Sequence, residues 1–335
     1  MAQPDWLENV LKQELVTTGV PGLVAGYIDV GNKPHLAASG IRQVGSDTPL
    51  QLTDAVHIGS CTKAVTALLI AAAVGDGQLR FTTTLGALDP IWKKSPWANR
   101  TVESLLRHEA GLPENATWWE LTRAGGELTS QRRNVLNPKW LSSGKVPAVG
   151  KFAYSNVGYV VLGSVIDKVY GRPYEDVLQL RIARPKLLQS VGFGVPSLAR
   201  GHRVTATGYL PTTLDNPPVM NSAGRLHLSV ADWLQTAALH MASNDFLDSN
   251  IRRVLHGSRM DGGYAGGWIV LNRSWAGGPA LTHAGSNTFW MASMWVAPKT
   301  GRAFAAVANG AGENISKGLD RIISAMIQRS SGITR

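Results

Sequence analysis

Strand-like segments lie near both ends of the chain, and the long region between them is mostly helical. Residues 23–30 and 35–40 flank a Gly-Asn-Lys-Pro turn, which predicts a pair of strands. Turn residues also bound four segments of strand composition near the other end: 267–272, 280–283, 289–296 and 302–308. Because the two sets are so far apart in sequence, we expect an α+β fold whose sheet is built from both termini.

This distribution predicts two structural parts, and 335 residues are enough for about two domains. Residues 1–80 together with 226–335 are expected to form an antiparallel sheet flanked by helices. Residues 81–225, where helical patches alternate with loops rich in Gly, Pro and Asn, are expected to form an inserted, mainly helical domain.

Capping residues predict where several helices begin. Asp5 is expected to cap a first helix that runs to about Thr18. Another helix follows Asn156, an N-cap residue type. Ser229 with Asp232 three residues later resembles a capping box, although Asp stands where Glu or Gln is usual.

The strongest chemical feature is Ser60 with Lys63 three residues later, at the start of an alanine- and leucine-rich helix. At a helix N-terminus, unpaired backbone amides and the helix dipole stabilise negative charge. Residues i and i+3 share a face and side chains lean back towards the N-terminus, so the amine can reach the hydroxyl. Burial beside the apolar helix would lower the pKa of Lys63, which could then act as a base for a Ser60 nucleophile.

Two alternatives compete with this pair. The same spacing recurs from Ser142 to Lys145, but that copy contains a glycine and runs into Val-Pro, so no helix aligns it. Cys61 is a rival nucleophile, because thiols are intrinsically better ones. On a helix it would not face Lys63, which favours its interpretation as a small buried side chain.

Two further clusters fit the first one. Tyr154 and Asn156 precede a helix and would point to the same side of an extended backbone. A tyrosine beside a lysine ammonium has a lowered pKa and can transfer protons, although such a tripeptide is more often a loop with an N-cap asparagine. His283 and Gly285 lie at the end of a predicted strand, where the Ser286 amide could face an oxyanion.

The three clusters, in this order, resemble the S-x-x-K, Y-x-N and K-T-G or H-x-G motifs of one serine hydrolase family. That family contains class C β-lactamases, DD-peptidases, D-aminopeptidases and related esterases. Residues 105–112 and 264–268 are similar to the segments that precede the second and third motifs, so the resemblance covers nearly the whole chain. It implies a β-lactamase/transpeptidase-like fold with the active site at the interface of the two parts.

The resemblance also implies a mechanism through an acyl-enzyme. Ser60 would attack a carbonyl while Lys63 and Tyr154 share its proton, and Tyr154 would later activate the deacylating water. Asn156 would orient Lys63 and hold a substrate oxygen. The backbone amides of Ser60 and Ser286 would form the oxyanion hole. No cofactor or metal ion is expected, because the histidines and the single cysteine show no ligand spacing.

The third motif decides the substrate class that we expect. The literal K-T-G at 299–301 follows a proline between two predicted strands, which favours a hairpin turn, so His283 and Gly285 are assigned to substrate binding. In class C β-lactamases a lysine and a threonine at this motif help bind the carboxylate of the antibiotic. His283 carries at most a partial charge near pH 7 and Ala284 has no hydroxyl, so an ester, a D-amino-acid amide or a peptide is favoured. A weak β-lactamase, or a penicillin-binding protein homologue with little turnover, is the alternative.

Charge and composition exclude other classes. The net charge of +10 comes from dispersed residues rather than from a stripe or tail, so nucleic-acid binding is not expected. The longest apolar stretch, 64–74, is too short for a membrane span. The N-terminus has no signal-peptide pattern, so we expect a cytoplasmic protein, or a periplasmic or secreted one from which a signal peptide has been removed.

Overall fold

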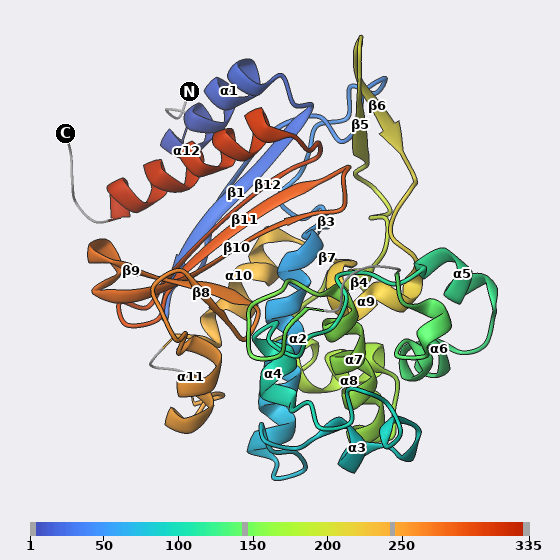
Figure 1. The fold of residues 1–335 in the computed structure, drawn as a ribbon. Coiled ribbons are helices and arrows are strands. Elements are labelled where there is room, and N and C mark those ends of the chain that lie inside the picture. Colours follow the sequence, from blue (N-terminus) through green and yellow to red (C-terminus); the bar gives the residue numbers. More distant parts are fainter. Residues whose placement is uncertain (1–4, 143–146, 242–244, 331–335) are drawn as a thin grey trace.

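The centre of the protein is a seven-stranded antiparallel sheet with strand order β2-β1-β12-β11-β10-β9-β8 (Figure 1). The computed structural model describes residues 5–142, 147–241 and 245–330. The strands are β1 (Gly22–Asp29), β2 (His35–Gly40), β8 (Gly263–Ala265), β9 (Trp268–Arg273), β10 (Gly278–Ser286), β11 (Met291–Ala297) and β12 (Arg302–Ala308). Because β1 pairs with β12, the sheet joins the two ends of the chain, which confirms the predicted α+β arrangement.

Helices cover both faces of this sheet. The terminal helices α1 (Trp6–Thr18) and α12 (Glu313–Ser330) lie together on one face (Figure 1). On the other face, α10 (Val230–Ala238) packs against β1 and β12. Successive strand residues point to opposite faces, so Leu23 packs with the terminal helices whereas Val24 belongs to the larger core on the other side.

The middle of the chain supplies the helices that lie beyond the sheet in Figure 1. Their bounds are α2 (Thr62–Gly75), α3 (Leu85–Leu88), α4 (Val102–Leu106), α5 (Trp118–Arg123), α6 (Leu128–Asn134), α7 (Asn156–Tyr170), α8 (Tyr174–Leu178), α9 (Asn221–Gly224) and α11 (Ser249–His256). A helix that is apolar on all sides must be buried, and α2 is enclosed by α7, α9 and α11. The division into domains at residues 80 and 225 stays a prediction.

Short strands complete the architecture. One small sheet has the order β3-β7-β4 and joins β3 (Val56–His57), β7 (Leu226–Leu228) and β4 (Gly192–Phe193). A separate hairpin of β5 (Gly201–Thr205) and β6 (Gly208–Thr212) projects beside the main sheet (Figure 1). Within the described residues, no helix combines the length and the apolar character that crossing a bilayer requires.

The predicted helix caps are partly confirmed. Asp5 caps α1 by accepting a hydrogen bond from the Leu7 amide at 3.1 Å. At α7, however, the cap is Ser155, whose hydroxyl accepts from the Gly158 amide at 3.0 Å. The expectation that Asn156 would be the cap is therefore wrong, and the Asn156 side chain is available for other contacts.

Only half of the capping box at α10 is present. The Ser229 hydroxyl accepts from the Asp232 amide at 3.2 Å, as predicted. The Asp232 carboxylate does not return this bond, because the Ser229 amide donates to Ser190 Oγ at 2.7 Å instead. Asp232 Oδ2 accepts from the amides of Gln189 and Ser190 at 2.9 and 2.8 Å. The shorter aspartate side chain thus fastens a neighbouring loop to the helix instead of completing the box.

One buried ionic cluster ties four helices of the middle region together. Arg132 on α6 is fully buried and donates two hydrogen bonds to Asp167 on α7, both 2.8 Å long. It donates two more, of 2.9 and 3.1 Å, to Glu175 on α8. Glu175 also accepts from Asn221 on α9 at 2.8 Å. The cluster satisfies the polar atoms of a guanidinium that would otherwise be very costly to bury.

Replacing Arg132 by alanine is expected to lower the free energy of unfolding by about 3–5 kcal/mol, because two carboxylates then lose their buried counter-ion. Urea denaturation followed by circular dichroism measures the change. Lys317→Ala is the control, because its ion pair with Glu313 is exposed and should contribute less than about 0.5 kcal/mol. Equal effects of the two substitutions would contradict a structural role of the cluster.

Candidate active site

Ser60 lies in a 3₁₀ turn, η1 (Gly59–Cys61), which connects β3 to α2. The half-buried Ser60 therefore lies two residues before the first residue of α2 and not in the first turn of that helix. Gly59 has a φ of +52°, and a Cβ there would lie 2.3 Å from the Ser286 amide nitrogen. Glycine is therefore required both by the backbone conformation and by the close approach of β10.

Lys63 follows on the first turn of α2 and is fully buried. Its Nζ lies 3.1 Å from Ser60 Oγ, 2.8 Å from Asn156 Oδ1 and 2.7 Å from the Ala223 carbonyl oxygen. Burial lowers the pKa of Lys63 to about 7, as predicted. A neutral amine has two N–H donors and one lone pair, so donation to Asn156 and Ala223 leaves the lone pair for Ser60.

Tyr154 completes the group around Ser60. Lys63 Nζ lies 4.8 Å from the centre of the Tyr154 ring. Burial raises the pKa of Tyr154 to about 12, although a hydrogen bond to Ser60 acts in the opposite direction. The prediction of a lowered tyrosine pKa is thus wrong. Burial disfavours the phenolate, and a lysine whose own pKa lies near 7 supplies little positive charge to stabilise it.

Asn156 is held in one orientation by two partners. Its oxygen accepts from Lys63, and its Nδ2 donates to Asn115 Oδ1 at 2.9 Å, which assigns the side-chain amide. Sequence reasoning missed Asn115, which lies in a loop with no distinctive pattern. It also missed Ala223, because this residue binds Lys63 through its backbone carbonyl, a group that every residue has.

The third cluster is at the end of β10, where residues 283–286 pair with β11 but no longer with β9. This free edge packs against η1. A Cβ on Gly285 would lie 2.1 Å from the Ile58 carbonyl oxygen and 2.9 Å from the Ser60 amide nitrogen. The contact brings the Ser60 and Ser286 backbones together, as an oxyanion hole requires. The literal K-T-G at residues 299–301 lies in the turn between β11 and β12, which confirms its interpretation as a hairpin turn.

His283 is a neutral side chain whose ring nitrogens both have protein partners. Nδ1 lies 2.6 Å from the Ala284 carbonyl oxygen and must donate, so Nε2 accepts from the Tyr264 hydroxyl at 3.1 Å. Burial, assisted by Lys63, lowers the pKa of His283 to about 3. This cluster therefore provides no cation near neutral pH. The predicted role of His283 in substrate binding stays a prediction.

The rival residues have other environments. Cys61 is buried, its Sγ lies 3.4 Å from the His283 carbonyl oxygen, and burial raises the pKa of the thiol, which disfavours a thiolate nucleophile. Lys145, of the second serine–lysine pair, lies outside the described residues. His108, which was not among these alternatives, lies against the Tyr154 ring and accepts a hydrogen bond from the Ser155 amide at 3.1 Å, which is a structural role.

Ser60 borders two hollows. The larger, of about 590 Å³, has a mostly apolar and aromatic wall that includes Phe152, Tyr264 and Ile269. Arg259 in this wall pairs with Glu109 at 3.1 Å. The smaller, of about 320 Å³, is lined by four asparagines from separate segments: Asn115, Asn156, Asn216 and Asn287. A scissile bond at Ser60 would have on one side a mostly apolar cavity, whose wall also carries Arg107, Glu109 and Arg259, and uncharged amides on the other.

Comparison with known proteins identifies the family of the chain. The sequence family described as Beta-lactamase matches residues 7–325. The chain belongs to the β-lactamase family. Its fold is accordingly the β-lactamase/transpeptidase-like one, and D-amino acid amidase from Ochrobactrum anthropi superposes with a TM-score of 0.80 over 97% of this chain and 99% of that one, at 20% identity.

Two curated relatives extend the comparison. An unguisins hydrolase of Aspergillus campestris is 26% identical over 68% of this chain, which spans only 45% of that protein's length. Penicillin-binding protein 4 of Amycolatopsis lactamdurans is 24% identical over 87% of this chain and 81% of its own. Together with the family match, they support a serine hydrolase of the β-lactamase family in general terms.

Gly285→Ala should slow the labelling of Ser60 by a fluorophosphonate probe at least about 100-fold, because the new methyl group pushes β10 away from η1. Intact-mass spectrometry follows the labelling. The matched control is Gly75→Ala, since a Cβ there meets only Ile251 Cδ1 at 3.7 Å and should change nothing. Similar labelling rates in both variants would show that the close approach is unimportant.

Proposed function

We propose that this β-lactamase-family protein is an acyl-transfer serine hydrolase. Its substrates are esters without a carboxylate, or D-amino-acid amides and peptides. The observation that carries the proposal is the buried Lys63 amine, 3.1 Å from Ser60 Oγ and with a pKa of about 7. Such an amine can take a proton from a serine hydroxyl at neutral pH, and neutral Lys63 has its lone pair free for this purpose.

The first half of the reaction forms an acyl-enzyme. Ser60 Oγ attacks the substrate carbonyl carbon while its proton passes to Lys63 Nζ. The developing oxyanion accepts hydrogen bonds from the backbone amides of Ser60 and Ser286, a contribution worth about 3 kcal/mol per donor. Asn156 keeps the lysine amine in place and offers its amide group to the substrate. Collapse of the intermediate breaks the bond to the leaving group.

Tyr154 relays protons in this scheme as a neutral phenol. It hydrogen-bonds to Ser60, and its pKa near 12 keeps the hydroxyl protonated at neutral pH. The Tyr154 hydroxyl gives its proton to the departing group and receives the one that Lys63 holds. In deacylation, water attacks the acyl carbon, its proton passes along the same two side chains in reverse, and Ser60 recovers its hydroxyl.

The choice of substrate rests on charge. A neutral His283 and a methyl group at Ala284 offer no partner to a carboxylate. Of the two guanidiniums in the larger hollow, Arg259 is paired with Glu109, and Arg107 donates to Glu103 and to two backbone carbonyl oxygens. The loss of such donors costs about 1–3 kcal/mol each for a carboxylate-bearing substrate. The name of one relative, a D-amino acid amidase, agrees with amide bonds, whereas penicillin-binding protein 4 favours β-lactam recognition as the second candidate.

The wild type is expected to turn over p-nitrophenyl butyrate or D-alanine p-nitroanilide, and Ser60→Ala should reduce kcat/KM by at least about 1,000-fold, because the nucleophile is lost. Nitrocefin should be a much poorer substrate. Cys61→Ser and Ser142→Ala are the matched controls and should stay within about 3-fold of the wild type. Turnover that persists in Ser60→Ala, or disappears only in Cys61→Ser, would refute the proposal.

A stable adduct separates the second candidate from the first. A penicillin-recognising protein would form a long-lived covalent adduct with a fluorescent penicillin on Ser60 and would show negligible turnover of every ester and amide. A hydrolase would show turnover of at least one neutral substrate, with no adduct that survives for hours.

The pH profile tests Lys63 as the base. Below its pKa the lysine is protonated and cannot accept a proton, so kcat/KM should rise with an apparent pKa of about 7. It should then stay level to about pH 10, because Tyr154 titrates later. Asn156→Asp places a negative charge beside the amine and should move the rising limb to higher pH. A limb unaffected by this substitution would assign the titration to another group.

A further inference from the structure

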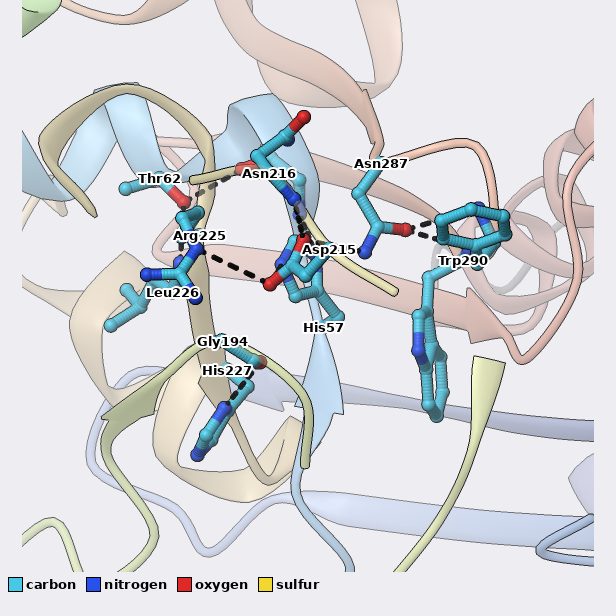
Figure 2. Close-up of polar contacts among 12 residues, drawn as sticks. His57, Thr62, Gly194, Asp215, Asn216, Arg225, Leu226, His227, Asn287 and Trp290 are labelled. Atoms are coloured by element: carbon cyan, nitrogen blue, oxygen red, sulfur yellow. Dashed lines mark hydrogen bonds and ion pairs between the residues drawn. The ribbon is translucent and has the colours of Figure 1, made fainter. Parts of the chain in front are cut away.

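Asp215 is a buried carboxylate with no part in the reaction described above. Its side chain is 4% exposed and lies in the loop between β6 and η5 (Pro218–Met220). Figure 2 shows the polar groups that surround it. Oδ1 accepts from the Asn287 side chain at 3.0 Å and from the Asn216 amide at 2.8 Å. Oδ2 lies 3.3 Å from His57 Nε2 and 3.4 Å from Arg225 Nε.

The charge of Asp215 is maintained by these partners. Burial alone would raise the pKa of Asp215, but hydrogen bonds from His57 and Asn287 and the positive charge of Arg225 bring it below its usual value. The carboxylate is thus ionised at neutral pH. A buried anion that is surrounded by several donors restrains the positions of the elements that carry them.

His57 connects this carboxylate to the nucleophile turn. It is fully buried on β3, and its Nδ1 accepts a hydrogen bond from the Gly59 amide at 3.1 Å. Nδ1 therefore carries no proton, so the ring proton is on Nε2, which lies 3.3 Å from Asp215 Oδ2. Because the Nδ1 lone pair is occupied, His57 is not available as a base for Ser60. Its bonds instead link Asp215 to the residue immediately before the serine.

Asn287 connects the same carboxylate to the end of β10. Its Nδ2 donates to Asp215, and its Oδ1 accepts from the amides of Phe289 and Trp290 at 3.1 and 2.9 Å (Figure 2). Asn287 directly follows Ser286. The carboxylate of Asp215 thus has a close contact with His57 and a hydrogen bond from Asn287, on the two sides of the place where the Ser60 and Ser286 amides converge.

We propose that Asp215 is a positioning residue that, through His57 and Asn287, sets the spacing of the two backbone amides of the oxyanion hole. The inference rests on the proposed acyl-transfer reaction. Pre-organised donors gain their effect from fixed geometry, because they need not reorient as charge develops. The contacts of Asp215 with His57 and Asn287 form a bridge between the two segments. Loss of either contact weakens the binding of the transition state more than that of the ground state.

The test compares Asp215→Asn with Asp89→Asn. Asp89 is an equally buried carboxylate that is paired with Arg133, among the middle-region helices. Asp215→Asn should lower kcat about 10–100-fold while KM changes less than about 3-fold and the rising pH limb stays near 7. The affinity for an arylboronic acid, whose tetrahedral adduct places an oxygen in the oxyanion hole, should fall in parallel with kcat. Asp89→Asn should lower thermal stability and leave kcat unchanged.

A second variant keeps the inference testable if Asp215→Asn does not fold. His57→Asn can retain an acceptor for the Gly59 amide but loses the bond to Asp215, so it should reproduce the kcat defect. The double variant should be no worse than either single one, because both remove the same link. Additive losses, an unchanged kcat, or a defect confined to KM would overturn the positioning role.

Failure of the proposed function and failure of the positioning role give different results. If the wild type has no Ser60-dependent turnover, the proposed function fails and the inference fails with it. If turnover depends on Ser60 but both bridge variants keep the wild-type kcat and boronic acid affinity, only the positioning role of Asp215 fails.

Discussion

The burial of one amine is the interaction on which the rest of the site depends. An ammonium group is costly to remove from water unless an anion accompanies it, and the polar contacts of Lys63 are a hydroxyl, an amide oxygen and a backbone carbonyl. Desolvation therefore lowers the pKa of Lys63 to the neutral range. The apolar helix α2, enclosed by its neighbours, keeps water away, so the packing of the core sets the pKa of this amine.

Two buried ionic clusters meet at the short helix α9. Glu175, held by Arg132, accepts from Asn221, and Asn221 in turn accepts from Arg225 at 2.6 Å. Arg225 reaches Asp215 beside the oxyanion hole. The same helix supplies the carbonyl that holds Lys63. The polar groups of the middle region, Lys63 and the segments around Ser60 and Ser286 thus lie in one continuous set of buried hydrogen bonds and close ionic contacts.

Much of the fold could be predicted because its determinants are local. Strand-length apolar segments between turn residues located the sheet, and a turn around 299–301 followed from the proline before it. The errors arose where a residue had several possible partners. Asn156 is a good capping residue by type, yet Ser155 caps the helix and Asn156 binds Lys63. The Asp232 amide donates to the Ser229 cap as predicted, but the Asp232 carboxylate binds a loop that is distant in sequence.

The sequence by itself determined the features that depend on spacing along the chain. Ser60 and Lys63 share a helical face because they are three residues apart, and the proline before residues 299–301 places that K-T-G in a turn. Only the tertiary structure decided how acidic or basic each group is and which distant residues support it. The raised pKa of Tyr154 and the link from Asp215 to His57 depend on burial and on contacts across more than 150 residues, which no local pattern encodes.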